Sequence, residues 1–270
     1  MVLPIALADG DVIGQAKTGT GKTLAFGIPV IERVIAPHDA EWADFDKKGL
    51  PQVLIVVPTR ELCTQVTKDI EELASNRGIR TVAVYGGRAF EPQIEALQAG
   101  VEIVVGTPGR LLDLSRQGQL KLKEVSRLVL DEADEMLRMG FIDDVEWVLE
   151  QIPTEHQTAL FSATMPKEVS VIAKKFMHNP KEITVGTKNA GTKNVSHEYY
   201  KVSGRDRYPA LRRLADANPQ IFSVVFCRTK SEVDRLSNVL SNAGYLANGL
   251  HGDMEQRQRE NVIKGFKQNS

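Results

Sequence analysis

Short apolar runs alternate with longer stretches of helical period along most of the chain. The runs are short, rich in β-branched side chains and mostly apolar throughout, as is typical of parallel strands that are buried on both faces. Seven of them precede residue 186 and an eighth begins a second group: Asp11–Gly14, Val53–Val57, Val82–Tyr85, Ile103–Val105, Leu128–Leu130, Ala159–Phe161, Ile183–Val185 and Ser223–Phe226.

The stretches between these runs have apolar positions at helical spacing. The pattern predicts helices over Lys22–Val34, Leu62–Asn76, Pro92–Ala99, Val145–Gln151, Val169–Phe176, Tyr208–Asp216, Glu232–Asn242 and Glu255–Lys264. A strand followed by a helix, repeated many times, predicts an α/β fold with a doubly wound parallel sheet.

One polar stretch interrupts this alternation. Residues 186–196 include two glycines, repeat the letters Thr-Lys-Asn and have no apolar periodicity. Such a composition is typical of a linker. We therefore expect a first domain at 1–186, a linker at 187–196 and a second domain at 197–270, which is within the usual size range for two domains.

The composition is that of an ordinary globular protein, with 42% hydrophobic and 26% charged residues. The sequence has neither a membrane-spanning apolar stretch of about 18 residues nor a secretory leader at Met1. Its two cysteines, Cys63 and Cys227, are far apart and have no CxxC or histidine partner at ligand spacing. These features exclude a disulfide scaffold and a zinc module, and they favour a reducing compartment such as the cytoplasm.

The net charge of −1 hides an asymmetry. Residues 1–187 contain 20 Lys+Arg and 27 Asp+Glu, a net charge of −7, whereas residues 188–270 contain 14 and 8, a net charge of +6. An acidic part followed by a basic part predicts two bodies with different tasks. The basic part suits an anionic partner, although a basic surface is equally consistent with simple solvation.

A glycine-rich segment follows the first predicted strand and opens the first predicted helix. Backbone N–H groups in such a loop bind phosphate oxygens, and the positive end of the helix dipole adds to the attraction. The lysine would reach the β- and γ-phosphates and the final threonine would ligate Mg²⁺. The alternative is a glycine-rich turn that only caps a helix. The expected nucleotide-binding residues are Ala16, Lys17, Thr18, Gly19, Thr20, Gly21, Lys22 and Thr23.

Three carboxylates, Asp131, Glu132 and Asp134, follow the predicted strand Leu128–Leu130. Parallel sheets bind ligands at the carboxyl ends of their strands, where Asp131 would hold Mg²⁺, largely through water. Glu132 could orient or deprotonate an attacking water. The alternative is an acidic helix start, since Asp and Glu favour that end of a helix. Together with the glycine-rich loop, the carboxylates predict hydrolysis of Mg-ATP on a RecA-like sheet.

The letters Asp131-Glu-Ala-Asp134 resemble the signature of the DEAD-box RNA helicases of superfamily 2, with a bacterial-type character. Other stretches resemble that family's motifs in the same order. They are Ala16–Thr23 for motif I, Pro58–Leu62 for Ia, Gly86-Gly87 for the paired glycines, Thr107–Arg110 for Ib, Ser162–Thr164 for III, Val225–Thr229 for IV, and Gln256–Arg259 after His251–Asp253 for the Gln-x-x-Arg element.

The resemblance implies an RNA-stimulated ATPase and RNA helicase with two RecA-like lobes, an ATP cofactor, Mg²⁺, and single-stranded or duplex RNA as partner. Lys22, Asp131 and Glu132 would be catalytic, and Asp134, Ser162 and Thr164 would relay the nucleotide state to the RNA. Hydroxyls, guanidiniums and backbone N–H groups grip phosphates without reading bases. The resemblance implies these RNA-backbone contacts: Thr59, Arg60, Gly87, Thr107, Gly109, Arg110, Arg228, Thr229, Gly252 and Arg259.

Single motifs have plainer interpretations. Pro58-Thr59 is also a plausible helix cap, and Gly86-Gly87 and Pro108-Gly109 are ordinary turn pairs. The family's Q motif upstream of Ala16, and motifs V and VI beyond residue 270, are absent from the sequence. We therefore expect a fragment of a longer helicase whose second lobe is incomplete. A non-catalytic module that binds RNA and nucleotide, and a RecA-like motor that acts on DNA, are the alternatives.

Overall fold

The computed structural model describes residues 2–16, 20–37, 39–42, 49–185 and 195–268. The residues group by their spatial contacts into two compact units, Met1–Gly191 and Thr192–Ser270. All but the last two residues of the expected linker at 187–196 lie outside the described residues.

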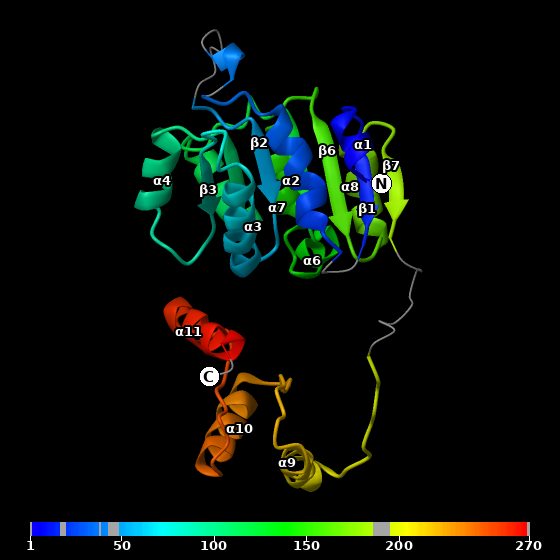
Figure 1. Cartoon of the computed structure of the whole chain (residues 1–270), viewed down its shortest axis with the longest axis vertical. Coiled ribbons are helices and arrows are strands. Elements are labelled where there is room, and N and C mark those ends of the chain that lie inside the picture. The colour runs from blue at the N-terminus through cyan, green and yellow to red at the C-terminus, as the bar shows by residue number, and fades with distance from the viewer. Residues whose placement is uncertain (1, 17–19, 38, 43–48, 186–194, 269–270) are drawn as a thin grey trace. The chain divides into compact units, whose positions relative to one another are not determined.

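The first unit is built on a parallel sheet of seven strands in the order β3-β4-β2-β5-β6-β1-β7 (Figure 1). Each predicted run before residue 186 forms one strand, to within two residues at its start and one residue at its end. The predicted α/β fold class is therefore confirmed for this unit. The strands are β1 Val12–Gln15, β2 Val53–Val56, β3 Thr81–Val84, β4 Ile103–Gly106, β5 Arg127–Leu130, β6 Gln157–Ser162 and β7 Lys181–Thr184.

Helices cover both faces of this sheet (Figure 1). They are α1 Val2–Leu7, α2 Lys22–Arg33, α3 Arg60–Leu73, α4 Glu91–Gln98, α5 Pro108–Arg116, α6 Ala133–Arg138, α7 Ile142–Leu149 and α8 Lys167–Phe176, with a short 3₁₀ turn, η1, at Ala40–Trp42. Among the described residues, no helix combines the length and the apolar character that crossing a membrane requires.

Two apolar cores lie on the two faces of the sheet, because successive strand side chains point to opposite faces. Leu54 and Val56 of β2 pack with residues of α5, α6, α7 and α8. Val53 and Ile55 of the same strand pack on the other face with residues of α2 and α3. The central strands β2 and β4 are therefore buried at every position, and their short apolar runs made them recognisable in the sequence.

The strand order divides the carboxyl edge of the sheet into two halves. Strands β5, β6 and β1 are neighbours and lead into the acidic motif, the Ser-Ala-Thr segment and the glycine-rich loop. Strands β3, β4 and β2 form the other half and lead into the segments at Gly86–Gly87, Thr107 and Thr59. Chain topology alone thus separates the candidate nucleotide residues from the candidate RNA residues.

The second unit contains helices α9 Arg207–Ala217, α10 Lys230–Asn242 and α11 Gln256–Lys267, and a 3₁₀ turn, η2, at Gly204–Asp206. The predicted strand at Ser223–Phe226 is wrong, because among the described residues of this unit no strand is formed. A parallel strand needs a neighbour to satisfy its backbone hydrogen bonds, and here the apolar run has none. Its side chains stay exposed, and Phe226 exposes 93% of its surface.

Candidate functional site

The glycine-rich loop begins where β1 ends beside β6. The amide of Ala16 donates to the carbonyl of Ser162 at 3.1 Å, so the start of the loop is tied to the neighbouring strand. Gly21 adopts a φ of 81°, and α2 starts at the next residue, Lys22. A left-handed turn at Gly21 is tolerated because glycine has no Cβ. The predicted nucleotide ligands Lys17, Thr18 and Gly19 lie outside the described residues.

Lys22 and Asp131 meet across this edge of the sheet. The Nζ of Lys22 lies 3.5 Å from Oδ1 of Asp131, and both side chains are buried. Burial raises the pKa of Asp131 above its ordinary value, and the positive charge of Lys22 opposes that rise. The structure thus brings together the lysine that is expected to bind phosphate and the carboxylate that is expected to bind Mg²⁺.

Glu132 occupies a strained position between β5 and α6. Its φ of 53° and ψ of 47° are left-handed, a conformation that costs a non-glycine residue about 1–3 kcal/mol and clusters at functional sites. Burial, and next the negative charge of Asp131, raise the pKa of the half-buried Glu132. The side chain lines a pocket together with Lys22, Asp134, Glu135, Arg138 and Ala163.

The donor set at this pocket suits Mg²⁺ bound with its water. Among the described residues, no three His, Cys, Asp or Glu side chains are close enough to hold a metal ion by themselves. Mg²⁺ prefers oxygen ligands and binds through one or two carboxylates plus waters and substrate phosphates. Asp131 offers a buried carboxylate, and the half-buried Thr23 lies one residue beyond Lys22 on α2.

Asp134, Ser162 and Thr164 form one hydrogen-bonded network. Thr164 donates to Oδ2 of Asp134 from its hydroxyl at 2.6 Å and from its amide at 3.0 Å. The amide of Asp134 in turn donates to the hydroxyl of Ser162 at 3.2 Å. Burial opposes ionisation of Asp134, but the hydrogen bonds from Thr164 and Ser162 outweigh it and lower the pKa. The network joins the start of α6 to the end of β6.

Replacing Thr164 by valine should destabilise the protein in a pH-dependent way. A hydrogen bond to a charged group contributes about 1.5–3 kcal/mol, so Thr164→Val should lower the free energy of unfolding by about that much at pH 7. The pKa of Asp134 is lowered by folding, so its contribution is present above the unfolded pKa and is lost as pH falls through the folded pKa. Urea unfolding from pH 7 to pH 3 measures both effects.

The control for this substitution is Thr67→Val, which makes the same change at a buried threonine elsewhere in the unit. The Thr67 hydroxyl donates to the carbonyl of Cys63 at 2.7 Å, and that acceptor does not titrate. Its loss should therefore cost the same at every pH in this range. If the two variants show equal pH dependence, the Asp134 carboxylate that accepts from Thr164 is not the charged group responsible.

The other half of the carboxyl edge brings together Thr59, Arg60 and Gly87. Thr59 caps α3, with its hydroxyl accepting from the amide of Leu62 at 3.2 Å, so the plainer interpretation as a helix cap is correct. Gly87 has a φ of 81°, and a Cβ built there would lie 2.5 Å from Cζ of Arg60. The guanidinium therefore lies directly against the paired glycines, and RNA contact for these three residues stays a prediction.

Thr107, Gly109 and Arg110 follow β4, between the other two strands of this half. Thr107 is buried, and Gly109 lies in the first turn of α5. Arg110 is also buried, exposing 7% of its surface, and its Nη2 donates to the carbonyl of Arg88 at 2.9 Å. The contact between Arg110 and RNA stays a prediction.

The four candidate residues of the second unit lie just before α10, between α10 and α11, and on α11. The hydroxyl of Thr229 caps α10 by accepting from the amide of Glu232 at 3.2 Å, and the Arg228 amide donates to the Glu232 carboxylate. The segment with Gly252 is held to the start of α10 by an ion pair between Lys230 and Asp253. Arg259, on α11, contacts the side chain of Gln256 at 3.3 Å.

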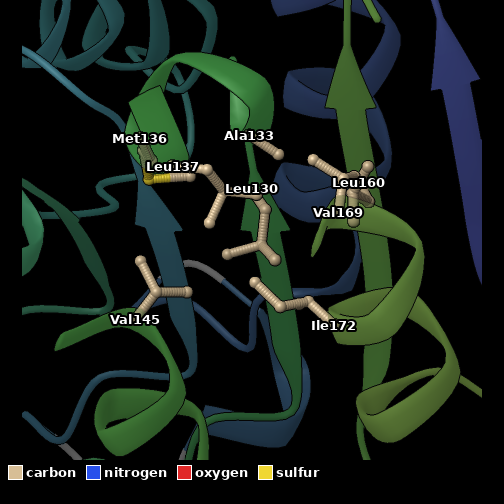
Figure 2. A pocket seen from close by; sticks show the side chains of 8 residues that line it. All are labelled: Leu130, Ala133, Met136, Leu137, Val145, Leu160, Val169 and Ile172. Carbon is tan, nitrogen blue, oxygen red and sulfur yellow. The ribbon is translucent and has the colours of Figure 1, made fainter. Parts of the chain in front are cut away.

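An apolar pocket lies behind the acidic motif (Figure 2). Side chains from β5 and β6 meet those of α6, α7 and α8 around it, and they include no polar group. Such a lining cannot hold phosphate or a metal ion, and it instead anchors α6 to the sheet. The lining residues are Leu130, Ala133, Met136, Leu137, Val145, Leu160, Val169 and Ile172.

The sequence model of the family described as DEAD/DEAH box helicase matches residues 1–172, which is more than half of the chain. The chain belongs to the DEAD/DEAH box helicase family. This result confirms the family predicted from the motifs. A second model, described as helicase conserved C-terminal domain, matches residues 206–270.

Relatives within the DEAD/DEAH box helicase family are similar over almost the whole chain. A DEAD-box ATP-dependent RNA helicase CshA from Geobacillus kaustophilus is 43% identical over 98% of this chain and 55% of its own length. The protein of the same name from Bacillus subtilis is 42% identical over 98% of this chain and 52% of its own length. The chain thus spans about half the length of the curated relatives it matches.

A solved structure supports the same family and fold. The crystal structure of a DEAD box protein from Methanococcus jannaschii is 42% identical, with a TM-score of 0.62, and the match covers 99% of this chain and 69% of the solved chain.

Three residues that line the pocket beside Glu132 were not predicted from the sequence, namely Ala163, Glu135 and Arg138. The signal for two of them was helical spacing, since Glu135 lies three residues beyond Glu132 and Arg138 lies three beyond Glu135.

Proposed function

We propose that the chain acts in an ATP-dependent RNA helicase that uses Mg-ATP to bind single-stranded RNA and to separate short duplexes. The relatives described above are named DEAD-box ATP-dependent RNA helicases. The observation that supports the proposal most is the 3.5 Å pairing of Lys22 with Asp131, beside the strained Glu132, at the carboxyl edge of a parallel sheet.

In the nucleotide half, the loop from Ala16 to Thr23 binds the phosphates, with Lys22 on the β- and γ-phosphates. Asp131 and Thr23 hold Mg²⁺ largely through water, and when bound the ion neutralises charge on the phosphate oxygens. Glu132 orients the attacking water and accepts its proton; its raised pKa brings it closer to the working pH of a general base.

In the RNA half, hydroxyls, guanidiniums and helix starts bind the sugar–phosphate backbone without reading the bases. Contact with the 2′-hydroxyl allows such a groove to prefer RNA over DNA. The network of Asp134, Ser162 and Thr164 relays the nucleotide state to this half. The residues proposed for RNA are Thr59, Arg60, Gly87, Thr107, Gly109 and Arg110 in the first unit, and Arg228, Thr229, Gly252 and Arg259 in the second.

A cytoplasmic location fits this function. Both cysteines, Cys63 and Cys227, are free thiols. Burial raises the pKa of the Cys63 thiol to about 12, which keeps it protonated and unreactive. A reducing compartment is where such thiols persist.

The decisive experiment is ATP turnover by the chain with and without single-stranded RNA, with Glu132→Gln as the blank. We expect RNA to raise turnover above that blank. Binding of labelled RNA and of a fluorescent ATP analogue is measured on the same samples.

The other outcomes separate the alternatives. Turnover that stays at the blank's level while RNA and nucleotide still bind would identify a non-catalytic binding module. Stimulation by DNA, with hydrolysis unaffected by RNA of the same sequence, would indicate a DNA motor. Failure to bind RNA at all would reject the proposal for this chain.

A further inference from the structure

The loop from Tyr85 to Phe90 joins β3 to α4 and contains Gly87. Two glycines in succession leave such a loop a wide choice of backbone conformations, because glycine loses the most conformational freedom on folding. A loop of this kind binds a ligand well only if other groups hold its shape beforehand. In this structure, two buried polar side chains supply that restraint.

The first is Gln93, on α4, which exposes 7% of its surface. Its Oε1 accepts from the amide of Tyr85 at 3.0 Å, and its Nε2 donates to the carbonyl of the same residue at 3.3 Å. The same Nε2 donates to the carbonyl of Ala89 at 3.0 Å. One amide therefore holds both ends of the loop, on either side of the paired glycines.

The second is Arg110, on α5. Besides donating to the carbonyl of Arg88, its guanidinium stacks on the ring of Phe90 with 3.8 Å between Cζ and the ring centroid. Arg110 thus holds the loop to the neighbouring helix start by two separate contacts. Its remaining Nη1 is buried and, among the described residues, has no hydrogen-bond partner.

We propose that Gln93 and Arg110 are positioning residues that fix the loop from Tyr85 to Phe90, so that Gly87 and Arg60 are in place for the RNA backbone. The inference rests on the proposed function, because RNA is the ligand whose binding they favour. Without them the loop must be ordered when RNA binds, and that cost appears as lost affinity. A misplacement of about 1 Å has large effects on such contacts.

The chain provides a closely matched control for Gln93. Gln52 exposes 6% of its surface, and its amide also bonds both backbone groups of a single residue, Ile35. Its Oε1 accepts from the Ile35 amide at 3.0 Å, and its Nε2 donates to the Ile35 carbonyl at 2.9 Å. Gln52 precedes β2, at the opposite edge of the sheet from the candidate groove.

The test compares Gln93→Leu with Gln52→Leu in the 270-residue chain. Fluorescence anisotropy measures the Kd for labelled polyuridine of about ten nucleotides, in the presence of adenylyl-imidodiphosphate. Both variants should unfold at a lower temperature than the parent chain, because each leaves buried backbone groups without partners. Only Gln93→Leu should weaken RNA binding, by roughly tenfold.

A second variant, Phe90→Leu, removes the ring under Arg110 and leaves the Gln93 amide in place. It should weaken RNA binding several-fold, and it tests the same inference if Gln93→Leu does not fold. RNA affinity equal to that of Gln52→Leu in the folded variants would overturn the inference. If the parent chain itself does not bind polyuridine, the proposed function fails first.

Discussion

Replacing Glu132 by glutamine should lower RNA-stimulated ATP turnover by about 10²–10⁴-fold, the usual contribution of a general base. The amide keeps the size of the side chain but cannot accept a proton from water. Glu132 lies half-buried in the pocket beside Lys22, at a left-handed backbone position that the strand-to-helix turn imposes. Nucleotide affinity, measured with a fluorescent ADP analogue, should stay close to that of the parent chain.

The pH dependence of turnover provides an independent check on the same residue. Burial, and next the charge of Asp131, raise the pKa of Glu132, so the side chain becomes protonated at a higher pH than an ordinary glutamate. As pH is lowered, turnover should therefore begin to fall at a higher pH than it would with an ordinary glutamate as the base. The residual turnover of Glu132→Gln should lack this acidic limb.

Glu150→Gln is the matched control, since it makes the same chemical change outside the pocket. Glu150 pairs with Lys175 at 3.1 Å, and Lys175 keeps its second partner, Glu146, when Glu150 is changed. Its turnover should equal that of the parent chain. If Glu132→Gln keeps near-parental turnover, another group must act as the general base.

The central strands of the first unit were predictable because their burial is uniform. Strands β2 and β4 are buried at every position, so they appear in the sequence as unbroken apolar runs between polar segments, whereas the edge strand β7 is mostly exposed. The carboxyl ends of the strands then place the loop at Ala16 and the carboxylate Asp131 at one edge without further information. The order of the strands, which separates the nucleotide half from the RNA half, was not contained in any local pattern.

Short helices and the second unit were less predictable. Helices α1 and α5 were missed, the latter because Pro108-Gly109 has the composition of a turn, and a helix at α6 was only the alternative interpretation of the acidic stretch. In the second unit, the run at Ser223–Phe226 has high strand propensity, but propensity forms no strand without a pairing partner. The helices there depend on local periodicity, and each of their ends was predicted to within three residues.

The residues that hold the site in shape were the hardest to find. Gln93 lies near the start of a helix, where a polar side chain normally points to solvent, and its bonds to Tyr85 arise only when the chain folds back. Arg110 likewise becomes buried only when the chain folds back and its guanidinium meets the carbonyl of Arg88. Motifs show which groups meet the ligand, whereas the groups that support them are determined by tertiary packing.

Replacing Gly87 by alanine should weaken RNA binding by roughly 10–100-fold, because it displaces Arg60 from the candidate groove. A Cβ at Gly87 would overlap the guanidinium, so the arginine must move away from the paired glycines. The left-handed φ of 81° adds backbone strain, which lowers stability by about 1 kcal/mol. Anisotropy with labelled polyuridine and thermal unfolding measure the two effects separately.

Gly118→Ala separates the displacement of Arg60 from the strain. Gly118 has a φ of 70°, and a Cβ built there meets nothing within 4 Å, so it introduces similar strain without a clash. Both variants should therefore lose similar stability, and only Gly87→Ala should lose RNA affinity. If the two variants bind RNA equally well, Arg60 does not act through its position against Gly87. RNA contact at this half of the sheet would then have to be assigned to the starts of α3 and α5.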